Sequence, residues 1–217
     1  MKCIILLGMP GSGKGTQAAT LCCRMNLAHL ATGDIFRDAM RDGTELGGKY
    51  KEYALRGELV PDEVVCDLVK GWMLKLGTSW DGVVFDGFPR TLTQAEVLED
   101  MIVELCCDQE SAILLTVDEG EVLRRLAGRR TCPECGKVFN TEMTSESYEC
   151  ELCHKSLVLR DDDCEEVVRR RLDVYQEETE QLANFYRVRG MLKEVVGVGS
   201  LAEVHDRIMI ELRGQND

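Results

Sequence analysis

The chain lacks the long apolar segments that membrane-spanning helices require. No stretch of its 217 residues approaches the roughly 18 consecutive apolar residues of a transmembrane helix. The apolar run near the N-terminus carries one lysine and is cut short by a glycine-rich segment, so it is too short for a secretory signal. These absences predict a cytoplasmic protein without a membrane partner.

Positive charge is also scarce. The chain has 26 Lys and Arg against 39 Asp and Glu, which gives a formal net charge of −13. Between Thr91 and Leu123 there is no lysine or arginine at all among nine acidic residues. Proteins that bind nucleic acid usually present a basic face, so we expect no nucleic-acid partner. Because the chain is negatively charged overall, any anion-binding site needs several arginines close together to make the local electrostatic potential positive.

A disulfide framework is absent, although the chain has 11 cysteines. Seven of them follow no framework spacing, and we interpret these as small buried hydrophobic residues in a reducing compartment. The sequence also shows no Ser–His or Cys–His arrangement typical of nucleophilic catalysis. The seven are Cys3, Cys22, Cys23, Cys66, Cys106, Cys107 and Cys164.

The segment around which the chain is organised lies at residues 3–16. A short apolar run stops at Gly8, glycines follow, and residues 14–25 favour a helix. The spacing Gly8-x4-Gly13-Lys14 is that of a phosphate-binding P-loop, in which backbone N–H groups, a helix N-terminus and a lysine surround a phosphate. One feature differs from the general motif, because Gly15 follows the lysine and the hydroxyl comes at Thr16. This segment predicts a nucleotide-phosphate site.

Two further segments place charged groups near that loop. Thr32 and Asp34 are both good N-cap residues, and Arg37 would lie in the first turn of their helix, where a bound anion would explain it. Residues 83–86 predict a strand beside the first one, with Asp86 facing the metal side of the phosphates. A tight turn then exposes Arg90 at the carboxyl end of the sheet, where open α/β sheets bind ligands.

The remaining pattern predicts an α/β fold with a doubly wound parallel sheet. We expect further strands at 111–117 and 192–196, and helices at 62–73, 91–106, 164–189 and 201–212. We expect His29 to be a partly buried polar residue, and His205 to lie at the surface of the last helix.

Four cysteines form two Cys-x2-Cys pairs that are separated by fourteen residues. This spacing matches a tetrahedral thiolate site, and Pro133 and Gly136 are typical of metal-binding knuckles. We predict structural zinc, with two redox pairs or a four-sulfur iron site as alternatives. His154 lies beside the last cysteine and could replace a ligand. The four cysteines are Cys132, Cys135, Cys150 and Cys153.

With these segments in this order, the chain resembles adenylate kinase of the long-lid bacterial type, in the subgroup whose lid carries a metal. The likeness runs over nearly the whole chain, and glycine after the P-loop lysine is typical of this family. The motifs that carry it are residues 8–16, 32–37, 85–91 with Gln94, 125–130, and 160–163 with Arg171.

The resemblance implies Mg²⁺-dependent phosphoryl transfer from ATP to AMP, giving two ADP, by a chain that is a monomer. It implies a P-loop core of residues 1–31, 62–124 and 164–217, a helical AMP-binding flap of residues 32–61, and a zinc-containing ATP lid of residues 125–163. Asp86 would act on Mg²⁺ through water, and the four cysteines would bind Zn²⁺.

The resemblance also assigns roles to individual residues. Gln94 would pair with the adenine of AMP, because an amide both donates and accepts hydrogen bonds. Catalytic roles fall to Lys14, Arg90, Arg125, Arg129, Arg160 and Arg171. ATP would contact Gly11, Ser12, Gly13, Lys14, Gly15, Thr16, Arg125, Arg129, Phe139 and Gly199. AMP would contact Thr32, Arg37, Gly57, Leu59, Val60, Gly87, Arg90, Gln94, Arg160 and Arg171.

The lid departs from the family pattern. The family usually has an aromatic-His pair and an Asn-Pro-Pro stretch after the first knuckle, whereas this chain has Val138-Phe139-Asn140-Thr141. We expect Phe139 to stack on the ATP base. Two other functions remain open: a nucleoside monophosphate kinase with another acceptor or donor, such as GTP, and a non-catalytic zinc-ribbon nucleotide sensor or nucleic-acid adaptor.

Overall fold

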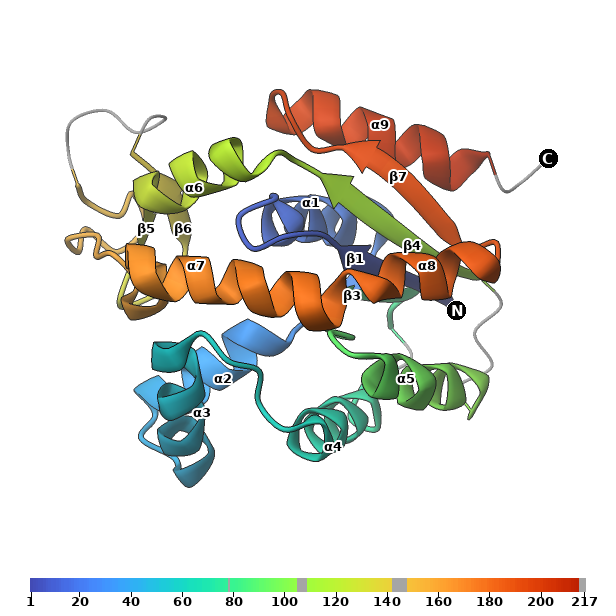
Figure 1. The fold of residues 1–217 in the computed structure, drawn as a ribbon, viewed down its shortest axis with the longest axis horizontal. Coiled ribbons are helices and arrows are strands. Elements are labelled where there is room, and N and C mark those ends of the chain that lie inside the picture. Colours follow the sequence, from blue (N-terminus) through green and yellow to red (C-terminus); the bar gives the residue numbers. More distant parts are fainter. Residues whose placement is uncertain (78, 105–108, 142–147, 215–217) are drawn as a thin grey trace.

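The computed structural model describes residues 1–77, 79–104, 109–141 and 148–214. Its centre is a five-stranded sheet in the order β2-β3-β1-β4-β7, with every neighbouring pair parallel (Figure 1). This confirms the predicted parallel sheet, because β3 does lie beside β1. The strands are β1 (Lys2–Leu7), β2 (Leu27–Ala31), β3 (Gly82–Asp86), β4 (Gln109–Thr116) and β7 (Leu192–Val196).

Helices cover both faces of the sheet (Figure 1). After the exposed Lys2, strand β1 is apolar because its alternate side chains enter opposite cores: Ile5 packs with α4, α5 and α8, whereas Leu6 packs with α1 and α9. The helices are α1 (Lys14–Met25), α2 (Thr32–Arg41), α3 (Glu45–Arg56), α4 (Asp62–Met73), α5 (Leu92–Glu104), α6 (Glu119–Gly128), α7 (Glu165–Val174), α8 (Gln181–Val188) and α9 (Leu201–Arg213).

A small two-stranded unit stands beyond α6. Strands β5 (Arg129–Thr131) and β6 (Val138–Asn140) pair antiparallel, and their core contains Cys132, Phe139, Cys150 and Leu157. A 3₁₀ turn, η1 (Asp161–Asp163), leads back into α7. In Figure 1 this unit and the α2–α3 pair lie at the same end of the molecule. Within the described residues, no helix has the length and apolar character needed to cross a membrane.

The structure adds strands β2, β5 and β6, helix α6 and a helix irregularity that the sequence pattern did not predict. β2 follows α1 directly, after Asn26 ends that helix in a left-handed conformation with φ 52°. The predicted helix at 164–189 is interrupted by a π-helical segment, η2 (Tyr175–Thr179), between α7 and α8. The predicted helix at 91–106 is α5, and positions 105–106 lie outside the described residues.

Two expectations about single side chains were wrong. His205 is fully buried, at 0% exposure, because its position on α9 turns toward α1 rather than toward solvent. Neither Thr32 nor Asp34 caps α2, since Ala31 stands at the N-cap without a side-chain bond. Both Thr32 and Asp34 lie inside the first turn of α2, where they have other partners.

Candidate active site

The turn between β1 and α1 has the backbone conformation that a phosphate cradle needs. Gly8, Gly11 and Gly13 have φ values of 138°, 82° and 101°, in the left-handed region that favours glycine. A Cβ on Gly11 would lie 2.9 Å from Cγ of Leu126, so α6 packs directly on the loop. The N-terminus of α1 and its unpaired N–H groups therefore open onto this turn.

Lys14 lies across the loop that precedes it. Its Nζ donates to the carbonyl oxygens of Gly8 at 2.7 Å and Met9 at 2.8 Å. Burial, together with repulsion from nearby cations, Arg90 first among them, lowers the pKa of Lys14 to about 8 against the attraction of Asp86. The lysine is thus held among positive charges with few counter-charges of its own.

Asp86 stands at the end of β3, beside the N-terminus of α1. Burial acts to raise its pKa, but His29 and the charges of Lys14 and Arg90 outweigh burial and hold that pKa below its ordinary value. The His29 Nε2 atom lies 3.8 Å from Asp86 Oδ2. A Cβ on Gly15 would come within 3.1 Å of the same oxygen. Gly15, which has no side chain, thus leaves space beside the ionised carboxylate of Asp86.

Arg125 connects α6 to the P-loop. Its guanidinium donates to the carbonyl oxygens of Ser12 at 3.3 Å and Gly197 at 3.0 Å, while its Nε donates to Glu121 at 2.7 Å. Hydrogen bonds from Arg124 and Arg125 lower the pKa of Glu121 to about 2. Gly199, with φ 125°, lies two residues beyond Gly197 in the loop between β7 and α9.

Three arginines come together where the small unit meets α7. Asp163 is completely buried and accepts from both Arg129 and Arg171, and Asp162 accepts from Arg171 at 3.0 Å. Arg160 donates to Thr131 Oγ1 at 2.8 Å. Burial, then repulsion from Arg37 and Arg129, lowers the pKa of Arg160 to about 10. The cations of α2, the small unit and α7 therefore share one electrostatic environment.

Arg37 lies on α2, and Arg90 lies in the turn that follows β3. Arg37 Nη2 pairs with Asp34 at 2.5 Å, one turn earlier on α2. Arg90 Nε donates to the Gly87 carbonyl at 3.0 Å, and Thr32 Oγ1 donates to the same oxygen at 2.9 Å. The Gly87 turn thus joins α2 to Arg90, and the Phe88–Pro89 peptide bond within it is cis.

Gln94 is buried in a short hydrogen-bond network. Its Oε1 accepts from the Arg90 backbone N–H at 2.8 Å, and its Nε2 donates to Asp62 Oδ1 at 2.7 Å. Asp62 Oδ2 accepts from Thr91 Oγ1 at 2.9 Å. These bonds fix which end of the amide points which way, and they leave one amide hydrogen and one oxygen lone pair for another partner.

The segment that follows α3 contacts α7 and the core that α4 and α5 share. Gly57 ends that helix with φ 68°, and a Cβ there would come within 2.9 Å of the Val167 carbonyl oxygen on α7. Leu59 and Val60 are half-buried, and Val60 packs on the core that α4 and α5 share.

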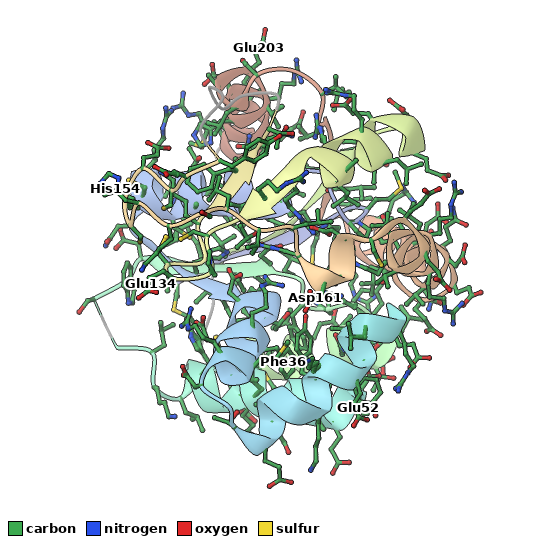
Figure 2. The ribbon with its side chains drawn as sticks, turned by 90° about the vertical axis from the view of Figure 1, so that its left-hand side faces the viewer. Phe36, Glu52, Glu134, His154, Asp161 and Glu203 are labelled. Carbon is green, nitrogen blue, oxygen red and sulfur yellow. The ribbon has the colours of Figure 1, made fainter. Side chains whose placement is uncertain are left out.

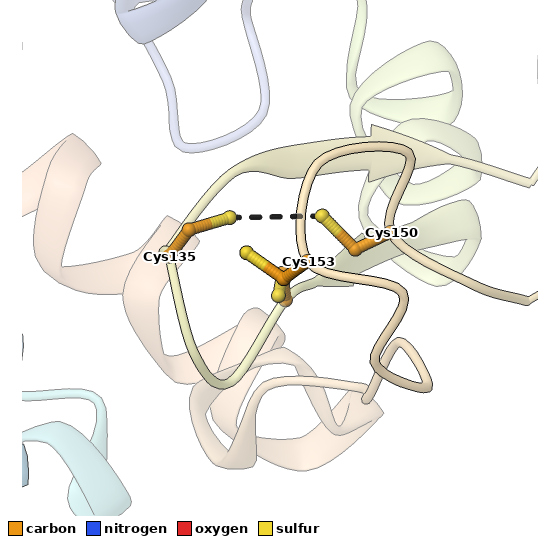
Figure 3. A group of neighbouring side chains, drawn as sticks. Cys135, Cys150 and Cys153 are labelled. Atoms are coloured by element: carbon orange, nitrogen blue, oxygen red, sulfur yellow. Dashed lines mark hydrogen bonds between the residues drawn. The ribbon is translucent and has the colours of Figure 1, made fainter.

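The four cysteines of the small unit converge, as their spacing predicts (Figure 3). Their Sγ atoms all lie within 4.8 Å of one another, and Cys135 Sγ is 3.6 Å from Cys150 Sγ. Each pair sits on an equivalent knuckle: the Gly136 N–H donates to Cys132 O at 3.0 Å, and the His154 N–H donates to Cys150 O at 2.8 Å. This donor set can bind one metal ion.

Comparison with known proteins identifies the family. A sequence model of the family described as adenylate kinase matches residues 6–191. Adenylate kinase of Ruminiclostridium cellulolyticum is 40% identical over 95% of this chain and 97% of its own length. Adenylate kinase of Syntrophotalea carbinolica is 42% identical over 96% of this chain and 97% of its own length. Adenylate kinase of Thermodesulfovibrio yellowstonii is 42% identical over 94% of this chain and 96% of its own length.

The chain belongs to the adenylate kinase family.

The contacts of Phe139 and His154 in the two-stranded unit bear on the roles expected of them. Phe139 is 8% exposed and packs in the core of this unit with Cys132, and Lys137 Nζ lies 5.3 Å from its ring centroid. In this conformation the unit's own core covers most of the ring. His154 is exposed (Figure 2), and it occupies the left-handed turn position of its knuckle, with φ 53°, as Gly136 does in the other knuckle. The cluster of four sulfurs is complete without it.

Several residues that support the site were not identified from the sequence. His29 was not linked to Asp86, nor Asp62 to Gln94, nor Glu121 to Arg125. For the first two pairs no local signal exists, because the partners are 57 and 32 residues apart and meet only through the sheet and the α4–α5 contact. The third pair is a readable i,i+4 pattern on α6.

Proposed function

We propose that the chain catalyses reversible, Mg²⁺-dependent transfer of a phosphoryl group from ATP to AMP, giving two ADP. The observation that carries this is the gathering of Lys14, Arg90, Arg129 and Arg171 in one buried environment, close enough to lower the pKa of the lysine. Phosphoryl transfer needs positioning and charge neutralisation more than a nucleophilic side chain. In a chain of net charge −13, this cluster reverses the local field.

The donor phosphates would lie in the P-loop turn. Backbone N–H groups and Lys14 would bind their oxygens, and Arg125, fixed against Ser12 and Gly197, would cover them from α6. We assign ATP to Gly11, Ser12, Gly13, Lys14, Gly15, Thr16, Arg125, Arg129 and Gly199. The proposed stacking of Phe139 on the base would require its ring to leave the lid core.

The acceptor would lie on the α2 and Gly87 side. Arg37 and Arg90 would bind its phosphate with their planar guanidinium groups. The amide hydrogen and the oxygen lone pair that Gln94 does not use within the protein would form hydrogen bonds with the base. We assign AMP to Thr32, Arg37, Gly57, Leu59, Val60, Gly87, Arg90, Gln94, Arg160 and Arg171. The arginines between the two sites would neutralise the transferring group.

Mg²⁺ would act with ATP and be oriented by Asp86 through water, since magnesium loses its water shell reluctantly. The observation that fits is a partly buried carboxylate that stays ionised beside Lys14 and the start of α1. When bound, the ion would neutralise charge on the transferring phosphates. Glycine at position 15 leaves room at that carboxylate.

We further propose that the four cysteines bind zinc. Tetrahedral thiolates at about 2.3 Å from zinc lie roughly 3.8 Å apart, and the four sulfurs already lie within 4.8 Å of one another. Such a closed site is structural and would stabilise a lid whose own core is small. Metal analysis should give one zinc per chain, and melting of the lid should shift down on chelation. An apo form that melts like the holo form would contradict the structural role.

We propose that residues 32–61 and 125–163 move as a flap and a lid over the core of residues 1–31, 62–124 and 164–217. Their closure would exclude water, which otherwise accepts the γ-phosphate. We also propose that the chain acts as a monomer in the cytoplasm.

A coupled assay of ADP formation from ATP, AMP and Mg²⁺ tests the reaction, with CMP, UMP and GMP as rival acceptors. Fast turnover with AMP alone supports the proposal. Turnover with another acceptor, or with GTP as the preferred donor, would assign a different nucleoside monophosphate kinase. Binding of ATP without any turnover would indicate a nucleotide sensor.

Arg90→Ala tests the placement of the acceptor. Removing this charge-assisted phosphate contact should lower kcat/KM by roughly a hundredfold, about 3 kcal/mol of transition-state stabilisation. The matched control is Arg41→Ala, because Arg41 is an exposed arginine paired with Asp38 on α2. A near-normal rate in the Arg90 variant would mean that the acceptor site lies elsewhere.

A further inference from the structure

A cavity of about 520 Å³ lies between the C-terminal ends of α1 and α9, away from the P-loop. Its walls include Arg24 and Met25 of α1, and His205, Met209 and Arg213 of α9. Both helices cover the same face of the sheet (Figure 1). Arg24 is ten residues along α1 from Lys14, which places it about 15 Å from the phosphate site at 1.5 Å per residue.

His205 lines this cavity without a hydrogen-bond partner. Its side chain is fully buried, and neither Nδ1 nor Nε2 makes a hydrogen bond. A buried polar group without a partner destabilises the folded chain. Burial, and then the charge of Arg24, lower the pKa of His205, so at neutral pH the ring carries one N–H that can donate. Both ring nitrogens lie below the surface, each with less than 1 Å² of accessible area, so the ring packs beneath the cavity and can report on a ligand there.

Two arginines at the same cavity are also unpartnered. Across the residues that the structure describes, Arg24 and Arg213 have no hydrogen bond or ion pair, whereas Arg37, Arg41 and Arg56 each pair with a nearby acid. In a chain with 39 acidic residues, two free guanidinium groups flanking one cavity are available for an external anion.

The rest of the lining limits what that anion can be. Met25 and Met209 form an apolar wall, and Ile210 at the rim is 68% exposed. Asp206 also lines the cavity, and its charge works against a polyanion such as a nucleotide. The combination suits one carboxylate carried on a short apolar body.

We propose that the cavity between α1 and α9 binds a small organic carboxylate, with Arg24 and Arg213 pairing with the anion, the methionines covering its apolar body, and His205 packed beneath it. This site is separate from the proposed nucleotide site, and it stands or fails independently of the phosphoryl-transfer activity.

The test uses hexanoate as the probe and the imidazole NMR signals of the full chain as the readout. The chain has three histidines, so each signal can be assigned. The His205 signals should shift and saturate with hexanoate, while those of His154 in the lid should not move. His29 beside Asp86 reports any binding at the nucleotide site.

Matched variants make the result specific. Arg24→Gln and Arg213→Gln should each weaken hexanoate binding by about tenfold, the equivalent of about 1.4 kcal/mol. Arg170→Gln, which removes an exposed arginine on α7 outside the cavity, should leave binding unchanged. Hexanamide, which has the same apolar chain without the charge, should not shift the His205 signals.

Three outcomes would overturn the proposal: no saturable shift at His205 with hexanoate, an equal shift with hexanamide, or binding that both cavity variants leave intact. Because Arg24 and Arg213 are exposed, their replacement should not unfold the chain. His205→Leu gives a second readout. It removes an unpartnered polar group that does not contact the anion, so the variant should melt no lower than the parent chain and should gain as much stability from hexanoate as the parent chain does.

Discussion

Lys14 combines burial, neighbouring positive charges and hydrogen bonds to the backbone. Its Nζ already donates to two loop carbonyls, and its neighbours include Arg90, Arg129 and Arg171. A phosphate placed in the turn would add the negative charge that this environment lacks. The pKa of the lysine should therefore rise when ATP binds.

This predicts proton uptake on ATP binding. The free lysine has a pKa of about 8 and the bound lysine a higher one, so binding should take up little at about pH 7.5 and most of one proton near pH 9. Calorimetry in two buffers of different ionisation enthalpy measures the uptake. An uptake that stays constant across that range would show that Lys14 keeps its charge without ligand.

Asp62 is predicted to set acceptor recognition through Gln94. Asp62→Asn should let the Gln94 amide rotate, because asparagine offers one acceptor oxygen where the carboxylate accepts from both Gln94 and Thr91. We expect KM for AMP to rise about fivefold, on the order of 1 kcal/mol for one hydrogen bond, with a smaller change in kcat. Asp67→Asn, an exposed carboxylate on the same helix, is the control. Equal KM values in the two variants would contradict this role.

At the scale of elements, the two cysteine knuckles differ in one informative position. Gly136 and His154 both have positive φ, at 72° and 53°, and each donates its N–H to the first cysteine of its pair. Glycine adopts this conformation without cost, whereas a side chain with a Cβ is strained there. The second knuckle therefore carries strain that the first does not.

His154→Gly should relieve that strain. We expect the lid to gain about 0.5–1 kcal/mol, part of the relief being offset by the greater freedom of glycine in the unfolded chain. Thermal melting of the metal-loaded protein measures it, with His154→Ala, which keeps the Cβ, as the control. A loss of metal in the glycine variant would instead mean that the imidazole helps to bind it.

The sequence predicted elements well where one strong local pattern decided them. The strand–loop–helix at Lys14 and the helix from Asp62 to Met73 are set by glycines, proline and apolar spacing over adjacent residues. β2 was missed because five residues with a histidine at their centre form a strand only through pairing with β3. His205 was misplaced because the outer face of α9 is defined by where α1 lies, which no local pattern records.

The candidate site follows the same division. Its cations were identifiable because they belong to short motifs. Some of their acidic partners lie on the same helix, as Glu121 does for Arg125. Others, such as Asp163 for Arg129, come from another element. The π-helical segment after α7 likewise has no local sequence signal such as proline or glycine. Long-range partners and helix irregularities were therefore beyond what the residues alone could predict.

At the scale of the whole molecule, Asp163 connects the two-stranded unit of β5 and β6 to α7. Its buried carboxylate receives Arg129 from β5 and Arg171 from α7. Asp163→Asn should lower the free energy of unfolding by about 3 kcal/mol, because it leaves two partly buried cations without their shared counter-charge. Chemical denaturation measures this, with the exposed neighbour variant Asp161→Asn as the control. Equal stability of the two variants would contradict the role of Asp163.

The same contacts have a consequence for how tightly a nucleotide can be held. In the structure, Asp162 and Asp163 accept hydrogen bonds from the guanidinium groups of Arg129 and Arg171, and two backbone carbonyls accept hydrogen bonds from Lys14. A phosphate entering here replaces partners instead of meeting bare cations, so only the difference between the two sets of bonds contributes to affinity. The internal carboxylates thereby weaken product binding as much as substrate binding. In a reversible enzyme, such built-in competition favours rapid release in both directions.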